Sequence, residues 1–158
     1  MRYVAIFALL FSLFACTGEP APEWKPLDLT KHNVPVTIAA PDSARVKATN
    51  LSGIMQDVTI TSPDDRYAVQ VLASQASTND MARLKSEQLQ LVRDNRYFAS
   101  VVREEPQGFV FQNKIDTTSI YGFRYIIYQG DQEFVFQNSF SGTFNLAEVE
   151  AMYAAVKQ

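Results

Sequence analysis

Residues that could act as nucleophiles or bases are few in this chain. The 158 residues contain one histidine, His32, and one cysteine, Cys16. Nucleophilic catalysis needs a base within hydrogen-bonding reach of a serine, threonine or cysteine, and His32 stands in Thr-Lys-His-Asn-Val-Pro with no glycine-rich elbow beside it. A single cysteine and a single histidine also exclude the usual zinc ligand sets. We therefore expect neither a catalytic residue nor a metal site.

Two pairs of adjacent carboxylates, Asp64–Asp65 and Glu104–Glu105, are the remaining candidates for acid–base chemistry. Hydrolysis by two carboxylic acids requires that both face one substrate in a cleft. Each pair stands beside a proline, in Ser-Pro-Asp-Asp and in Glu-Glu-Pro-Gln-Gly, and such sequences are typical of turns. The sequence also has no phosphate-binding loop, dinucleotide fingerprint or EF-hand loop. We therefore predict a protein that is not an enzyme and has no cofactor.

The single cysteine follows an apolar segment at the N-terminus. Arg2 precedes an apolar run over residues 3–15, which is shorter than the roughly 20 residues that span a bilayer and is typical of a secretory signal. Leu13-Phe14-Ala15-Cys16 resembles the lipobox of bacterial lipoproteins, with a bulkier residue at Phe14 than that family usually has. The resemblance implies a signal peptide over residues 1–15 and lipidation of Cys16. The alternative is an ordinary signal peptide with an incidental cysteine.

The lipid anchor implies a location and a first partner. Enteric lipoproteins that stay in the inner membrane carry Asp after the cysteine, whereas this protein has Thr17, so the resemblance favours the periplasmic face of the outer membrane in a bacterial cell envelope. Residues 16–26 contain three prolines and are predicted to form an extended spacer. The lipid anchor implies the membrane as one partner, and we expect an envelope protein as the other. The formal charge is −3 and no window concentrates basic residues, so we expect no nucleic acid as a partner.

Residues 27–158 are predicted to form one α+β domain, because 47% of the residues are hydrophobic and the length fits a single core. Apolar residues alternate with a period of two over Val34–Ala39, Ala44–Thr49, Ile54–Thr61 and Tyr67–Ala73. The period then changes to 3.6. The helix predicted over Thr78–Asn95 has Met81, Leu84, Leu91 and Val92 on its apolar face, Leu89 at the margin, and Ser77, Thr78 or Asn79 as its cap. A second helix over Asn145–Gln158 has Asn145 and Glu148 at capping-box spacing and an apolar stripe of Leu146, Val149, Met152, Tyr153 and Val156.

Between these helices the sequence Phe-Val-Phe-Gln-Asn occurs twice, at 109–113 and 134–138, and predicts two similar hairpins. Gly130-Asp131 suits the two-residue turn of the second hairpin and pairs Tyr125 with Phe136 and Ile126 with Val135. One face is then an aromatic core. The other face carries the candidate interaction surface, Arg124, Ile126, Tyr128, Val135 and Gln137, because tyrosine and arginine are enriched at protein interfaces. The alternative is that a helix covers this face.

The order of four strands, a helix, four strands and a C-terminal helix resembles the PsbP-like fold of photosystem II extrinsic subunits and small bacterial lipoproteins. The resemblance covers residues 24–158 and rests on this order, on Pro35-Val-Thr-Ile38, on the Lys-Ser-Glu region of the central helix and on the lipobox. It implies a non-catalytic protein-binding or assembly role. The alternative function is that of a carrier for a small apolar ligand, held in a pocket between sheet and helix.

Overall fold

The computed structural model describes residues 24–157, so the predicted signal peptide and Cys16 lie outside the described residues. Nine strands, one short 3-10 helix and two α-helices follow one another in this part of the chain. In order they are β1 (Lys25–Asp28), η1 (Thr30–His32), β2 (Thr37–Ala40), β3 (Arg45–Leu51), β4 (Met55–Thr61), β5 (Ala68–Gln75), α1 (Met81–Arg93), β6 (Phe98–Glu105), β7 (Gly108–Ile115), β8 (Thr118–Gln129), β9 (Gln132–Asn138) and α2 (Leu146–Val156).

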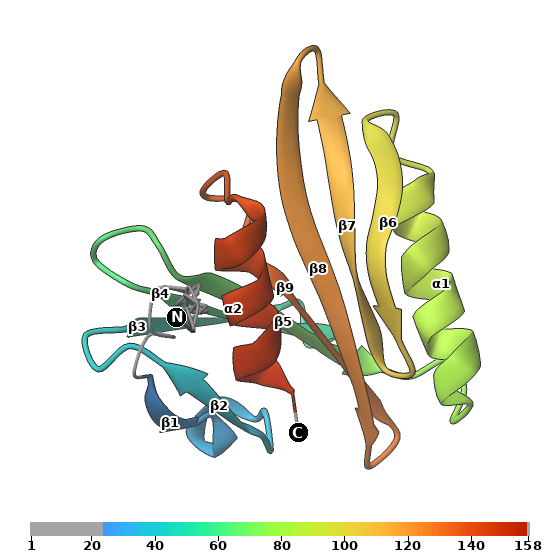
Figure 1. The fold of residues 1–158 in the computed structure, drawn as a ribbon. Coiled ribbons are helices and arrows are strands. Elements are labelled where there is room, and N and C mark those ends of the chain that lie inside the picture. The colour runs from blue at the N-terminus through green and yellow to red at the C-terminus, as the bar shows by residue number, and fades with distance from the viewer. Residues whose placement is uncertain (1–23, 158) are drawn as a thin grey trace, which may run out of the picture.

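The strands form a seven-stranded antiparallel sheet, in the order β3-β4-β5-β9-β8-β7-β6, and a separate hairpin of β1 and β2 (Figure 1). The predicted α+β class with a central and a C-terminal helix is confirmed. Five strands rather than four precede α1, because Lys25–Asp28 pairs with Thr37–Ala40. The folded chain therefore begins before the predicted boundary at residue 27, and Trp24 already packs edge-on against Tyr67 with ring centroids 4.8 Å apart.

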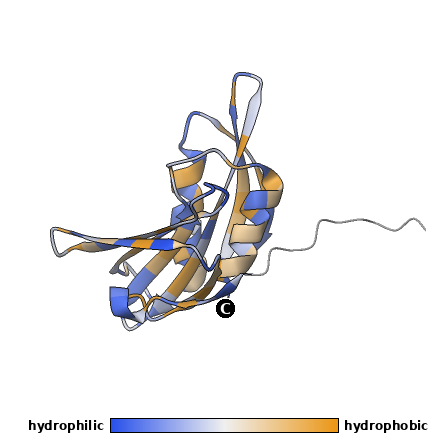
Figure 2. Cartoon of the chain, turned by 90° about the vertical axis from the view of Figure 1, so that its left-hand side faces the viewer, coloured by the Kyte–Doolittle hydropathy of each residue, from blue (hydrophilic) through white to orange (hydrophobic). Residues whose placement is uncertain are grey.

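The β8–β9 hairpin has the predicted register, with Tyr125 opposite Phe136 and Ile126 opposite Val135. Its turn residues, Gly130 and Asp131, have φ values of 59° and 62°. Two left-handed residues give the turn a twist that matches that of the flanking strands. Hydrophobic and hydrophilic residues alternate along the strands (Figure 2), and this alternation fixes the register because a slip of one residue would turn the aromatic side chains toward the other face.

The helix α2 covers one face of the sheet and closes the main core. Asn145 and Glu148 form the predicted capping box, in which each side chain accepts a hydrogen bond from the backbone N–H of the other. The ring of Tyr153 makes T-shaped contacts with Phe123 and Tyr125, at centroid distances of 5.8 and 6.0 Å. Within residues 24–157, neither helix is long and apolar enough to cross a membrane.

The helix α1 packs on the opposite face, over Phe109 and Phe111. Asp80 caps it, rather than any of residues 77–79, and its side chain accepts hydrogen bonds from the N–H groups of the first turn. Its buried residues are Leu84, Leu89 and Val92, whereas Leu91 is 66% exposed. The predicted apolar face was therefore wrong at Leu91. Positions 89 and 91 lie about 200° apart around a helix, so only one of them can face the sheet.

Replacing each of these two leucines by alanine in turn is expected to distinguish the face of α1 that packs on the sheet from the face in solvent. Leu89→Ala should lower the free energy of unfolding by about 2 to 4 kcal/mol because it leaves a cavity against Phe109 and Phe111. Leu91→Ala should change it by less than about 0.5 kcal/mol because the side chain is already in solvent. Urea denaturation of both variants measures the difference. A larger loss at Leu91 would mean that α1 is rotated about its axis.

Candidate binding groove

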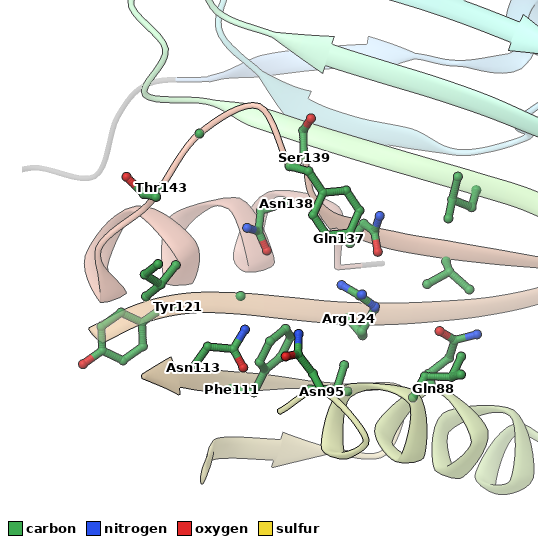
Figure 3. A pocket seen from close by; sticks show the side chains of 18 of the residues that line it. Gln88, Asn95, Phe111, Asn113, Tyr121, Arg124, Gln137, Asn138, Ser139 and Thr143 are labelled. Atoms are coloured by element: carbon green, nitrogen blue, oxygen red, sulfur yellow. The ribbon is translucent and has the colours of Figure 1, made fainter. Parts of the chain in front are cut away.

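A groove of about 580 Å³ lies on the face of the sheet opposite α2 (Figure 3). It exists because α1 lies along β6, β7 and β8 and leaves the neighbouring strands of this face uncovered. One wall is α1, the other is formed by β5 and the loop after β9, and β7, β8 and β9 form the floor. The residues used below are Leu91, Phe111, Asn113, Arg124, Glu133, Val135, Gln137 and Phe140.

A row of polar side chains runs across the strands into the groove. Gln137 Nε2 donates a hydrogen bond to Gln70 Oε1 over 2.6 Å, and Gln70 Nε2 donates to Asp57 Oδ2 over 2.9 Å. The next strand continues this row with Arg124, which stands opposite Gln137 in the β8–β9 register. These hydrogen bonds join the side chains of β9, β5 and β4 on the face of the sheet that carries Arg124.

Arg124 is the only cationic side chain among the described residues that line the groove. It is partly buried, its Nη1 donates to the carbonyl oxygen of Phe123 over 3.0 Å, and its guanidinium carbon lies 5.7 Å from the centroid of the Phe111 ring. No carboxylate among residues 24–157 forms an ion pair with it. Burial lowers the pKa of Arg124 to about 10, so the guanidinium is still charged at neutral pH.

The apolar parts of the groove are a buried floor and an exposed rim. Phe111 and Val135 are only 6% exposed, whereas Leu91 on α1 and Phe140 after β9 are 66% and 84% exposed. Gly122 lets the Phe111 ring lie across β8, since a Cβ there would come within 2.6 Å of the ring. Exposed apolar side chains that border a concave surface are typical of a binding site.

Asn113 contributes an unusual polar atom to the groove. Its side-chain Oδ1 is buried and has no hydrogen-bond partner among the described residues. The equivalent asparagine of the second Phe-Val-Phe-Gln-Asn copy, Asn138, accepts a hydrogen bond from the N–H of Phe123 over 3.1 Å. Sequence reasoning did not select Asn113, although its place in the repeat was a signal that could have found it. A buried acceptor without a donor costs free energy, which a ligand with a donor would recover.

The five residues of the predicted interaction surface do not form one exposed patch. Arg124, Val135 and Gln137 line the groove. Ile126 is fully buried because α1 lies against β8, so its expected exposure was wrong. Tyr128 lies at a second, smaller depression beside residues 75–79, where its hydroxyl donates to Asp131 Oδ1 over 2.7 Å.

The candidate acid–base residues lie elsewhere. Glu104 and Glu105 end β6 and pair with lysines, Lys85 Nζ at 2.8 Å from Glu104 and Lys157 Nζ at 2.7 Å from Glu105. The predicted turn therefore lies at residues 106–107, directly after these two glutamates, which themselves end β6 and form ion pairs. Asp64 and Asp65 form the predicted turn after β4, where Asp64 accepts hydrogen bonds from the Ser62 hydroxyl and the Arg66 N–H.

His32 lies in the 3-10 helix η1 between β1 and β2. It is not among the residues that line the groove. Residues 24–157 contain no cluster of three histidine, cysteine, aspartate or glutamate side chains that could hold a metal ion. The groove is therefore the arrangement with the clearest chemistry in this part of the protein.

No family model, curated protein or solved structure matches the sequence. Among the described residues, the groove offers a guanidinium without a carboxylate partner, a buried acceptor without a donor and an apolar rim. Such a surface can bind an extended partner.

Glu133, the only carboxylate among the described residues that line the groove, gives a prediction with a defined sign. Burial raises its pKa, which the hydrogen bond from Gln88 Nε2 partly lowers and the nearby charge of Glu87 raises. A carboxyl with a raised pKa contributes stability while protonated, below its unfolded pKa of about 4.3, and loses it as the pH rises through the folded pKa. Glu133→Gln should therefore melt at a higher temperature than the wild type at neutral pH, with no difference at about pH 3.

The matched control for this prediction is Glu104→Gln, which should have the opposite sign. The hydrogen bond and charge of Lys85 lower the pKa of Glu104, so its charged form stabilises the fold above the unfolded pKa and this contribution is lost as the pH falls. Thermal melting of both variants at neutral pH and at about pH 3 measures whether the two changes in melting temperature have opposite signs. A lower melting temperature of Glu133→Gln at neutral pH would contradict the assignment.

Proposed function

We propose that this protein is a membrane-anchored envelope lipoprotein that binds a protein partner through the groove between α1 and β5, without catalysis. The observation that supports this best is the exposed apolar rim of Leu91 and Phe140 on either side of the partly buried, unneutralised Arg124. Protein interfaces favour an apolar and arginine-containing centre of this kind. Assembly of an envelope complex is the role that such a module serves.

The anchor and the fold family are parts of the same proposal. Leu13-Phe14-Ala15-Cys16 supports lipidation at Cys16, and Thr17 supports the periplasmic face of the outer membrane. The α+β order is compatible with a PsbP-like domain, with the extra strand β1 before it. Since Trp24 packs against Tyr67 and β1 begins at Lys25, the proposed spacer between lipid and domain is residues 16–23. We expect this proline-containing length of polypeptide to separate the groove from the bilayer surface.

A carrier of a small apolar ligand is the second candidate. The groove volume of about 580 Å³ supports it, because it lies within the range of small-ligand pockets. Native mass spectrometry of the protein purified from the cells that make it separates the two candidates. A carrier retains a small molecule, whereas the proposed module does not.

The proposed function is tested by photocrosslinking in those cells. A benzophenone amino acid is placed at Leu91 or at Phe140 on the groove rim, and at the exposed Lys31 in η1 as the control. We expect a covalent protein adduct from each rim position and none from Lys31. Adducts that form only at Lys31, or at none of the three positions, would contradict binding at the groove.

Lipidation gives an independent prediction. Cys16→Ser is expected to abolish the lipid and to leave the signal peptide uncleaved by the lipoprotein peptidase, while the melting temperature of the domain stays unchanged because residue 16 precedes β1. Intact-mass spectrometry of the wild type and the variant measures the lipid directly. A mature wild-type protein that carries no lipid, or that begins at another residue, would show that Cys16 is incidental.

A further inference from the structure

The charge of Arg124 points to a ligand group. Its guanidinium has no carboxylate partner within residues 24–157, and the only carboxylate that these residues bring to the groove is Glu133. Glu133 stands four residues along β9 from Gln137, the partner of Arg124, which places it about 13 Å away along the strand. A guanidinium that is partly buried and not neutralised is complementary to a carboxylate, which it can bind with two parallel hydrogen bonds.

A second complementary group lies on the other side of Arg124. Arg124 stands opposite Phe109 on β7, and Asn113 follows four residues further in the direction away from Glu133. The backbone of Asn113, whose Oδ1 has no hydrogen-bond partner among the described residues, therefore lies about 13 Å from that of Arg124 along the strand direction. The Asn113 Oδ1 atom requires a hydrogen-bond donor. The floor between the two groups is the Phe111 ring over Gly122.

These positions fit a peptide better than a hydrocarbon tail. An extended peptide carries a backbone N–H about every 3.3 Å along its length, whereas the tail of a fatty acid has no donor for Asn113. The apolar rim of Leu91 and Phe140 offers contacts for apolar side chains of the same segment. The carboxylate of Glu133 repels an anionic group from the far end, so it sets the direction in which the segment lies.

We propose that the groove binds an extended peptide segment of a partner protein whose carboxylate pairs with Arg124 and which donates a backbone N–H, further along the segment, to Asn113. This inference rests on the proposed function and names the chemistry of its partner. The carboxylate comes from the C-terminus of the partner or from an acidic side chain. Both sources offer the same two oxygen atoms to the guanidinium, and the experiment separates them.

The test uses the full-length lipidated protein in detergent and two libraries of random hexapeptides. One library ends in a free C-terminus, and in the other the random segment is followed by a fixed neutral sequence. We expect enrichment of sequences with a carboxylate at one fixed position, either the terminus in the first library or Asp or Glu in the second. Enrichment in only one library identifies the source.

Affinity of the selected peptide for Arg124 variants then tests the ion pair. Arg124→Gln should weaken binding about ten- to a hundredfold, as expected for loss of a charge-assisted hydrogen bond, and Arg124→Lys should weaken it less. The control is Arg66→Gln, in the exposed turn between β4 and β5, which should leave the affinity unchanged. Amidation of the peptide carboxylate must cause a loss similar to that of Arg124→Gln, and this measurement needs no folded variant.

The outcomes separate this inference from the proposed function. Peptides that bind in competition with a crosslinker at Leu91, but with no fixed carboxylate and with unchanged affinity for Arg124→Gln, overturn the inference and leave groove binding intact. Peptides that bind away from Leu91, or no selected peptide at all, overturn both. Selection of no peptide together with binding of dodecanoate at the groove assigns the site to an anionic amphiphile instead.

Discussion

Replacement of Phe136 by alanine is expected to lower the free energy of unfolding by about 3 to 5 kcal/mol. The side chain is fully buried, and its strand β9 lies in the middle of the sheet between β5 and β8. Val71 and Tyr125 stand opposite it on these two strands, and its ring centroid is 6.3 Å from that of Tyr125. Side chains of the two neighbouring strands, β5 and β8, therefore flank the cavity that alanine would leave. Guanidinium denaturation, with fluorescence and circular dichroism compared, measures the loss.

The adjacent residue provides the control. The sequence alone predicts a cost below about 0.5 kcal/mol for Gln137→Ala, because Gln137 is on the other face of β9. The structure raises this value to about 1 to 2 kcal/mol, since Gln137 is 2% exposed and its amide donates to Gln70, which would lose its donor. The order of the two effects should still hold. Equal losses at Phe136 and Gln137 would mean that the faces of β9 are assigned wrongly.

The sequence was sufficient for features that depend on near neighbours. The register of β8 and β9 follows from Gly130-Asp131 and from the alternation of aromatic residues on both sides of it. The capping box of α2 follows in the same way from Asn145 and Glu148. Turn geometry and capping act over two to four residues, so their signals lie within a short window of sequence.

Features that depend on distant partners were beyond the sequence. The strand β1 lies in a proline-containing segment and forms only because β2 pairs with it. The orientation of α1 also depends on its neighbour, because Leu89 and Leu91 are the same residue type and only the position of Phe109 and Phe111 selects between them. Tertiary packing, rather than periodicity, decides both cases.

In the candidate site, too, the sequence predicts what depends on near neighbours but not what depends on distant partners. The alternation of side-chain directions along a strand predicted that one face carries Arg124, Val135 and Gln137. All three line the groove. The row from Gln137 through Gln70 to Asp57 depends on pairing between β5 and β9, which are far apart in sequence. Within residues 24–157, Arg124 has no carboxylate partner and the side-chain oxygen of Asn113 has no donor. Both facts depend on the residues that surround these side chains in the fold, so neither residue type could predict them. Sequence reasoning could therefore name part of the site but not its chemistry.

An acidic residue at position 126 is expected to unfold the domain. Ile126 is fully buried, pairs with Val135 and donates its backbone N–H to the carbonyl oxygen of Gln107 over 2.8 Å. Arg124 points to the same face two residues away, about 7 Å along the strand. A glutamate could extend toward this guanidinium, so aspartate, with its shorter side chain, is the sharper substitution. Ile126→Asp buries a carboxylate without a partner and should cost at least about 4 kcal/mol.

The matched control is Tyr128→Gln, on the same face and strand but only partly buried. It removes the hydrogen bond to Asp131 and should cost about 1 kcal/mol. Thermal melting, followed by circular dichroism, compares the losses of stability in the two variants. If Ile126→Asp folds and melts like the wild type, α1 does not cover β8, and the five predicted residues form an exposed surface after all. If it unfolds, a loss of binding in that variant reports only on folding, and the groove must be tested at its rim, where Leu91 and Phe140 are exposed.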